Sequence, residues 1–122
     1  MTIKDNLKSD QNFAIKGVVR IIGENDRFFG PGRLQLLENI IATGSISQAA
    51  KLMGMSYKKA WDMVQSMNQQ VIKPIVSTQT GGEKGGGTIV TEEGKHLMAA
   101  FKQLHEEIQQ SFDLKLQEFL AS

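Results

Sequence analysis

The sequence contains no cysteine, and it has only two prolines, one tryptophan and one tyrosine among its 122 residues. Without cysteine the chain can form neither disulfide bonds nor thiolate metal sites. No apolar run approaches the roughly 20 residues that a membrane-spanning helix needs. The first residues, MTIKDNLKSDQN, are polar and lack the apolar region of a secretory signal. We therefore expect a soluble, cytoplasmic protein that does not contact a membrane.

Patterns that typically carry catalysis or hold a metal ion are also missing. His96 and His105 are nine residues apart in one predicted helix. At about 100° per residue they lie on opposite sides of that helix and cannot share a metal ion. No serine or threonine has a neighbouring histidine arranged as nucleophile and base. We predict a protein that is not an enzyme and that needs no cofactor.

The formal net charge of +1 gives no sign of a strongly basic nucleic-acid-binding protein, but the charge is unevenly distributed. Residues 44–91 contain five Lys/Arg and two Asp/Glu, whereas residues 92–122 contain three Lys/Arg and six Asp/Glu. Phosphate binding depends on the local field at the contact surface, so the basic centre is compatible with a DNA-binding face. Unevenly scattered surface charge without such a function explains the same numbers.

The local patterns predict one domain over residues 1–122, beginning with a flexible N-terminus at 1–12. The β-branched stretch KGVVRII, the turn-forming GEND and the aromatic RFF together predict a short hairpin over 16–29. Three helices are expected over 31–71. Pro31 suits the first turn of the first helix, and Gly44 ends its apolar pattern.

Residues 47–69 have the order of a helix-turn-helix, which is a short helix, a tight turn and a second helix with a polar outer face. Ser45 and Gln48 have the spacing of a capping box at the start of the first helix. Gly54 suits the left-handed conformation at the turn, and Ser56 can cap the second helix. An unspecialised helical hairpin remains the alternative to this interpretation.

The second helix of this motif carries an apolar stripe that leaves polar residues outside. Trp61 shares that stripe with Ala60 and Val64, so we expect it in the core. Lysine can neutralise phosphate, glutamine can pair with adenine, and hydroxyl groups can contact either phosphates or bases. We predict that the DNA contacts of this helix are Ser56, Tyr57, Lys58, Lys59, Asp62 and Gln65. A solvated helix face is the alternative for each of them.

Two strands separated by a glycine-rich loop are predicted over 75–90, followed by a helix over 91–120. The loop TGGEKGGGT lacks the Lys-Ser/Thr and following helix of a phosphate-binding P-loop, so we interpret it as a wing along the DNA backbone. The wing contacts predicted are Lys84, Gly85, Gly86 and Thr88. A loop without a partner is the alternative.

The apolar spacing of the last helix is close to that of helix–helix packing. Part of this helix should pack on its own domain, and the remainder should meet a second copy of the chain in a homodimer. The predicted dimer residues are Leu104, Ile108, Phe112, Leu116 and Phe119. The expected fold is therefore α+β and mostly helical: a winged helix-turn-helix with a short N-terminal hairpin and a long C-terminal dimerisation helix.

The stretches TGSISQAAKLMGMSYKKAWDMVQSMNQ and TGGEKGGGTIVTEEG resemble the N-terminal DNA-binding domain of the ModE family of molybdate-responsive transcriptional regulators. The resemblance extends from Gly30 to about Ile108. It implies a LysR-like winged helix and a dimer paired through its long helices. It also implies DNA contacts at Ser47 and Gln48, besides Ser56–Lys59 and the wing.

Full-length members of that family carry C-terminal molybdate-binding modules, whereas this chain ends at Ser122. The resemblance therefore carries over DNA binding, but it does not carry over molybdate sensing. The first hypothesis is a dimeric regulator that reads a near-palindromic operator, with a link to genes of molybdenum uptake or cofactor synthesis. A protein-interaction module on the same scaffold is the second hypothesis. A regulator that binds molybdate at its dimer interface is the third, and it requires an oxyanion pocket.

Overall fold

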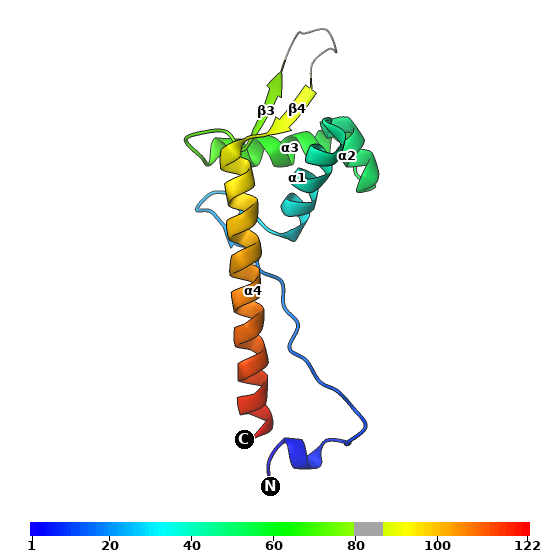
Figure 1. Ribbon diagram of the computed structural model, residues 1–122, viewed down its shortest axis with the longest axis vertical. Helices are drawn as coiled ribbons and strands as arrows, with labels where there is room; N and C mark the ends of the chain where they lie inside the picture. The colour runs from blue at the N-terminus through cyan, green and yellow to red at the C-terminus, as the bar shows by residue number, and fades with distance from the viewer. Residues whose placement is uncertain (80–86) are drawn as a thin grey trace.

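The computed structural model describes residues 1–79 and 87–122 (Figure 1). Four helices, two strand pairs and one turn of 3₁₀ helix make up the described chain. In chain order they are η1 (Lys4–Asn6), β1 (Ile21–Ile22), β2 (Arg27–Phe29), α1 (Pro31–Thr43), α2 (Ile46–Leu52), α3 (Tyr57–Gln69), β3 (Val76–Gln79), β4 (Gly87–Val90) and α4 (Glu92–Leu120). This architecture confirms the predicted α+β, mostly helical winged helix-turn-helix.

One hydrophobic core joins all of these elements except η1. The largest side chains that are fully buried come from α1, β2 and α3, and α4 adds Met98 and Phe101. The rings of Phe29 and Phe101 meet edge to face with their centroids 5.1 Å apart, which ties the hairpin to α4. The core residues are Phe29, Leu36, Leu37, Ile40, Ile46, Ala49, Ala50, Ala60, Val64, Met67, Ile75, Val76, Val90, Met98 and Phe101.

Two glycines with positive φ make the tight joins between helices. Gly44, with φ of 69°, ends α1, and Gly54, with φ of 64°, lies in the turn between α2 and α3. A side chain at such an angle would strain the backbone. The turn is closed by the N–H of Met55, which donates to the carbonyl of Ala50 at 3.0 Å. The spatial relation of α2 to α3 therefore depends on residues that the sequence already marked as turn-forming.

The start of α2 corrects one detail of the predicted capping box. Ser45 Oγ accepts a hydrogen bond from the N–H of Gln48 at 3.1 Å, as expected. The reciprocal bond from the Gln48 side chain is not formed, because the N–H of Ser45 donates to Oγ1 of Thr43 instead. The cap therefore holds one backbone N–H of the helix rather than two.

The wing strands pair antiparallel, with Val76 opposite Val90 and Gln79 opposite Gly87. The loop end of β4 is joined to the C-terminal end of α1, because the N–H of Thr88 donates to the carbonyl of Gly44, the C-cap residue of α1, at 2.9 Å. The loop between the strands lies outside the described residues.

The N-terminal part of the chain differs from its prediction. The paired strands of the hairpin are shorter than the predicted span 16–29, and residues 16–20 run alongside without regular pairing. The segment 1–12 contains the 3₁₀ turn, and the N–H of Ile3 donates to the carbonyl of Ser122 at 2.8 Å; its flexibility remains a prediction. The two chain ends therefore lie together at the far end of α4 (Figure 1).

Within the part of the chain that the structure describes, no helix combines the length and apolarity required to span a membrane. The same residues contain no group of three His, Asp or Glu side chains placed to hold a metal ion.

Candidate nucleic-acid interface

The amphipathic helix α3 turns one face into the core and leaves the other in solvent. Ala60, Val64 and Met67 are at most 2% exposed. The side chains of Lys58 and Asp62 point outward, and they are 83% and 59% exposed. The residues of the outer face thus do not pack in the core and are available to contact a ligand.

The first turn of α3 is held by its N-cap. Ser56 Oγ accepts a hydrogen bond from the N–H of Lys59 at 3.1 Å, so this hydroxyl is engaged in capping the helix. One turn further, Nζ of Lys58 pairs with Oδ2 of Asp62 at 3.0 Å. The charges of the predicted contact residues Lys58 and Asp62 therefore partly cancel each other. Lys59 makes no ion pair with any described residue.

The placement of Trp61 contradicts the prediction that it belongs to the core. Its side chain is 37% exposed and stacks on Tyr57, which is 54% exposed, with ring centroids 6.3 Å apart. The buried stripe runs along Ala60, Val64 and Met67. Trp61 lies at the edge of this stripe, where its ring stacks on Tyr57 and does not enter the core. The outer face of α3 thus carries an aromatic pair beside its lysines.

The other predicted contacts have different environments. Ser47 and Gln48 are exposed on the first turn of α2, and Gln65 is half-buried on α3. Thr88, which we predicted to contact DNA from the wing, is only 9% exposed in β4. It therefore does not lie on the accessible surface that such a contact needs. Lys84, Gly85 and Gly86 lie outside the described residues.

The two flanks of α3 are fixed to the neighbouring hairpins by side chains. On the wing flank, Asn68 Oδ1 accepts from the N–H of Ile75 at 2.8 Å, and its amide donates to the carbonyl of Val76 at 2.9 Å. On the opposite flank, Ser66 Oγ donates to Oδ2 of Asp26 at 2.5 Å. This hydrogen bond, with one from the N–H of Arg27, lowers the pKa of Asp26. The exposed face of α3 therefore lies between two anchored hairpins.

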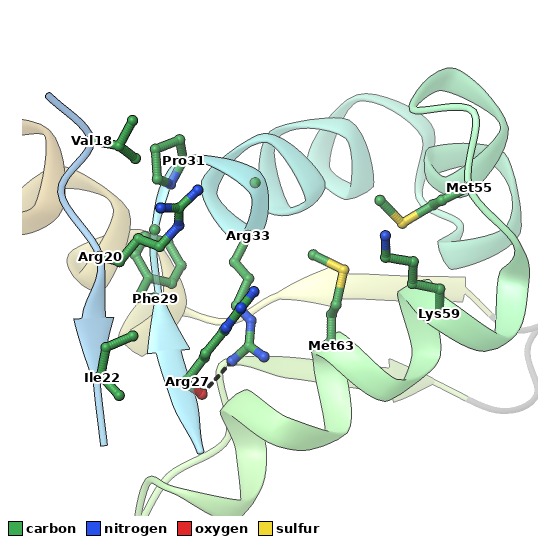
Figure 2. Close-up of a pocket in the computed structure, with 12 residues that line it drawn as sticks. Val18, Arg20, Ile22, Arg27, Phe29, Pro31, Arg33, Met55, Lys59 and Met63 are labelled. Carbon is green, nitrogen blue, oxygen red and sulfur yellow. Dashed lines mark hydrogen bonds between the residues drawn. The ribbon is translucent and has the colours of Figure 1, made fainter. Parts of the chain in front are cut away.

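The hairpin flank also holds a group of arginines that the sequence analysis missed. Arg20, Arg27 and Arg33 line a hollow next to Lys59 (Figure 2). The Arg33 guanidinium donates to the carbonyls of Arg27 and Phe28 at 2.7 and 2.9 Å. These arginines are spread over 14 positions of the sequence, so no basic run marks them, and only the folding of the hairpin onto α1 brings them together.

A model of bacterial regulatory helix-turn-helix proteins of the lysR family matches residues 31–95, which cover α1 through the first residues of α4. The chain belongs to this lysR family. It is a family of regulators rather than enzymes, as the sequence predicted.

Curated relatives support the same assignment and confirm the resemblance to ModE. The DNA-binding transcriptional dual regulator ModE of Escherichia coli (strain K12) is 42% identical over 87 residues, which cover 71% of this chain and 33% of the relative. The molybdenum-pterin-binding protein MopB of Rhodobacter capsulatus is 49% identical over 72 residues, covering 59% and 27%. The molybdenum transport protein ModE of Azotobacter vinelandii is 42% identical over 81 residues, covering 66% and 30%. The chain spans about a third of the length of these relatives.

Proposed function

We propose that this protein binds double-stranded DNA and regulates transcription in the manner of a ModE-type regulator. The observation that carries the proposal is the exposed face of α3, where Lys58, Lys59, Tyr57 and Trp61 stand clear of the core beside the wing strands. A helix of this kind fits the major groove with its first turns at the base edges. Lysines would supply phosphate or guanine contacts, and the aromatic pair would supply apolar contact.

DNA binding is tested by fluorescence anisotropy with a duplex across a salt series. Lys58→Ala/Lys59→Ala should weaken binding and reduce the salt slope by about 0.9 for each phosphate that is no longer neutralised. Lys102→Ala/Lys115→Ala removes the same charge from exposed positions on α4 and is the matched control. Equal weakening of DNA binding in both variants would mean that the effect comes from the overall charge of the protein and not from contacts of α3. Absence of binding by the native chain at low salt would favour a protein-interaction module instead.

The chain is proposed to act as a homodimer paired through the far half of α4. In one copy, Leu104 and Phe119 are 36% and 56% exposed, and Ile108 and Phe112 are half-buried. An apolar face of this extent in water favours cover by a second molecule. Leu116 is only 9% exposed within the single chain, so it has little left to contribute to such an interface. Two-fold pairing would present two α3 helices to a near-palindromic operator.

The dimer is tested by sedimentation of Leu104→Lys/Phe119→Lys. Lysines in an apolar interface would lose hydration without gaining a partner, so the variant should sediment as a single chain of 13.5 kDa. Gln110→Lys/Gln117→Lys adds the same charge on the opposite side of α4 and should leave the native mass unchanged. A native chain that sediments at 13.5 kDa at high concentration would contradict dimerisation.

The genes regulated are proposed to serve molybdenum uptake or cofactor synthesis. This part rests on relatives whose names refer to molybdenum transport and molybdenum-pterin binding. Sequencing of the genomic fragments that the purified protein retains from its own genome would test it. Fragments upstream of oxyanion-transport or cofactor genes are expected, and enrichment of unrelated promoters alone would refute the link.

A further inference from the structure

A cavity of about 470 Å³ lies between the N-terminal hairpin, the first turn of α1 and the hairpin flank of α3. In Figure 2, Val18, Arg20 and Ile22 form one side, and Met55, Lys59 and Met63 face them from the helix-turn-helix. Its volume falls in the usual range of small-molecule sites, about 300–1,000 Å³. Nothing in the proposed DNA contacts requires a hollow of this size.

The charge around this cavity is entirely positive among the described residues. Arg20, Arg27, Arg33 and Lys59 line it, and no aspartate or glutamate does. None of the four makes an ion pair with a described side chain. The carboxylate of Asp26, next in sequence to Arg27, accepts from Ser66 and lines a separate hollow. The charge of Asp26 still acts on Arg27 and Arg33, so the cavity presents four cations, two of which are partly compensated by one carboxylate outside its lining.

Arg33 is held in place without the help of a carboxylate. Its guanidinium is oriented by the carbonyls of Arg27 and Phe28, and the donation of one nitrogen to both leaves its other donors available. Partial burial lowers the pKa of Arg33 from its ordinary value, although an arginine keeps its charge near neutral pH. A pre-oriented guanidinium of this kind suits a planar or tetrahedral oxyanion group.

The rest of the lining is apolar. Phe29, which is 2% exposed, lines the cavity together with Val18, Ile22, Met55 and Met63. An inorganic oxyanion would pair with the arginines but leave this apolar surface in contact with water.

We propose that the cavity binds a small organic anion, with a hydrocarbon or aromatic body against the apolar lining and a carboxylate, sulfonate or phosphate group at the arginines. Its occupancy would engage Lys59, which is also a proposed DNA contact, so binding of the two ligands would be coupled.

The probe for this site is 8-anilinonaphthalene-1-sulfonate, which joins an aromatic body to one anionic group. N-phenyl-1-naphthylamine has the same aromatic body without the sulfonate and is the matched control ligand. Binding is followed by NMR of the full chain labelled at its six methionine methyl groups. Met55 and Met63 line the cavity, whereas Met98 is buried in α4 and reports that the fold is intact.

Titration with the sulfonate should shift the Met55 and Met63 signals to saturation and leave Met98 in place. Arg20→Gln/Arg27→Gln changes two exposed residues and should weaken binding about tenfold or more, as expected when charge-assisted hydrogen bonds are removed. Lys102→Gln/Lys115→Gln removes the same charge from α4 and should bind as the native chain does. The uncharged control ligand should bind at least about tenfold more weakly than the sulfonate.

Three results would overturn the proposal. The first is shifts at Met55 and Met63 that the arginine substitutions leave unchanged, or that the uncharged ligand produces equally well. The second is tighter binding of inorganic phosphate or molybdate than of the sulfonate, which would assign the cavity to a bare oxyanion. The third is absence of sulfonate binding by the native chain; if Arg20→Gln/Arg27→Gln also loses DNA affinity, the cavity is assigned to a DNA phosphate instead. Because the titration contains no DNA, its outcome is independent of the proposed DNA binding.

Discussion

The two halves of α4 are one continuous helix in two different environments. Along the first half, Gly94, Met98 and Phe101 are buried against the strands and the hairpin. Beyond residue 102 the helix leaves the compact domain, and Leu116 is its only buried residue (Figure 1). The first half is therefore packed into its own domain, whereas most residues of the second half are exposed in the single chain.

This difference separates the part of α4 that contributes to the fold of the single chain from the part that we propose for dimerisation. A substitution in the first half should act on the free energy of unfolding of each chain, because it changes the packing of the core. One in the second half should act weakly there, because the side chains of that half pack little against the rest of the chain. The following predictions compare matched positions in the two halves.

The largest contrast is expected between Phe101→Ala and Phe112→Ala. Phe101 is 3% exposed and packs edge to face on Phe29, so its truncation should lower the free energy of unfolding by about 3–5 kcal/mol. Phe112 is half-buried, with its ring close to Gly17, and its truncation should cost roughly 1 kcal/mol. Urea denaturation at one protein concentration measures both. Equal destabilisation would show that the second half is as well packed as the first.

A smaller effect is expected from Gly94→Ala in the first turn of α4. An added Cβ would lie 2.5 Å from the carbonyl oxygen of Ile75 and 2.6 Å from Val90, so the helix would have to move away from the wing base. Overpacking of this kind costs about 1–3 kcal/mol. Gly32→Ala, in α1, meets nothing within 4 Å and should be neutral or stabilise by up to about 1 kcal/mol. Thermal denaturation separates the two variants, and a stable Gly94→Ala chain would disprove the close approach.

The sequence predicted the elements whose causes are local. Gly54 marked the turn of the helix-turn-helix, Ser56 marked the start of α3, and the apolar spacing marked the core face of α1. These features depend on backbone conformation and side-chain periodicity, which are visible in a short stretch of residues.

The features that the sequence did not predict depend on interactions between distant segments. The exposure of Trp61 follows from where the buried stripe of α3 meets α1 and α2, and the burial of Thr88 follows from its bond to Gly44. The residue type alone suited the predicted role in both cases, which was a core position for Trp61 and a DNA contact for Thr88. The arginine-lined cavity likewise exists only because the hairpin folds back over α3. Periodicity identifies a face, but the arrangement of neighbours decides whether that face is covered.

The smallest contrast compares two polar side chains that tie α4 to other segments. Thr91 Oγ1 accepts from the N–H of Gly94 at 3.1 Å and donates to the carbonyl of Pro74 at 2.6 Å, so Thr91→Ala removes both an N-cap and a link to the strand. A destabilisation of about 1 kcal/mol is expected. Thr91→Ser keeps the hydroxyl and should recover most of that stability.

In the second half, Gln109 donates to the carbonyl of Ile15 at 3.4 Å, and the same nitrogen also reaches Asp113 at 3.2 Å. A bond this long contributes little, and water can replace it, so Gln109→Ala should change the free energy of unfolding by less than about 0.5 kcal/mol. Urea denaturation of Gln109→Ala and Thr91→Ala under identical conditions measures the difference. A destabilisation by Gln109→Ala as large as that by Thr91→Ala would mean that residues 13–17 are part of the folded unit and stabilise the far half of α4. The proposed dimer interface would then have to lie on the side of α4 that this segment leaves open.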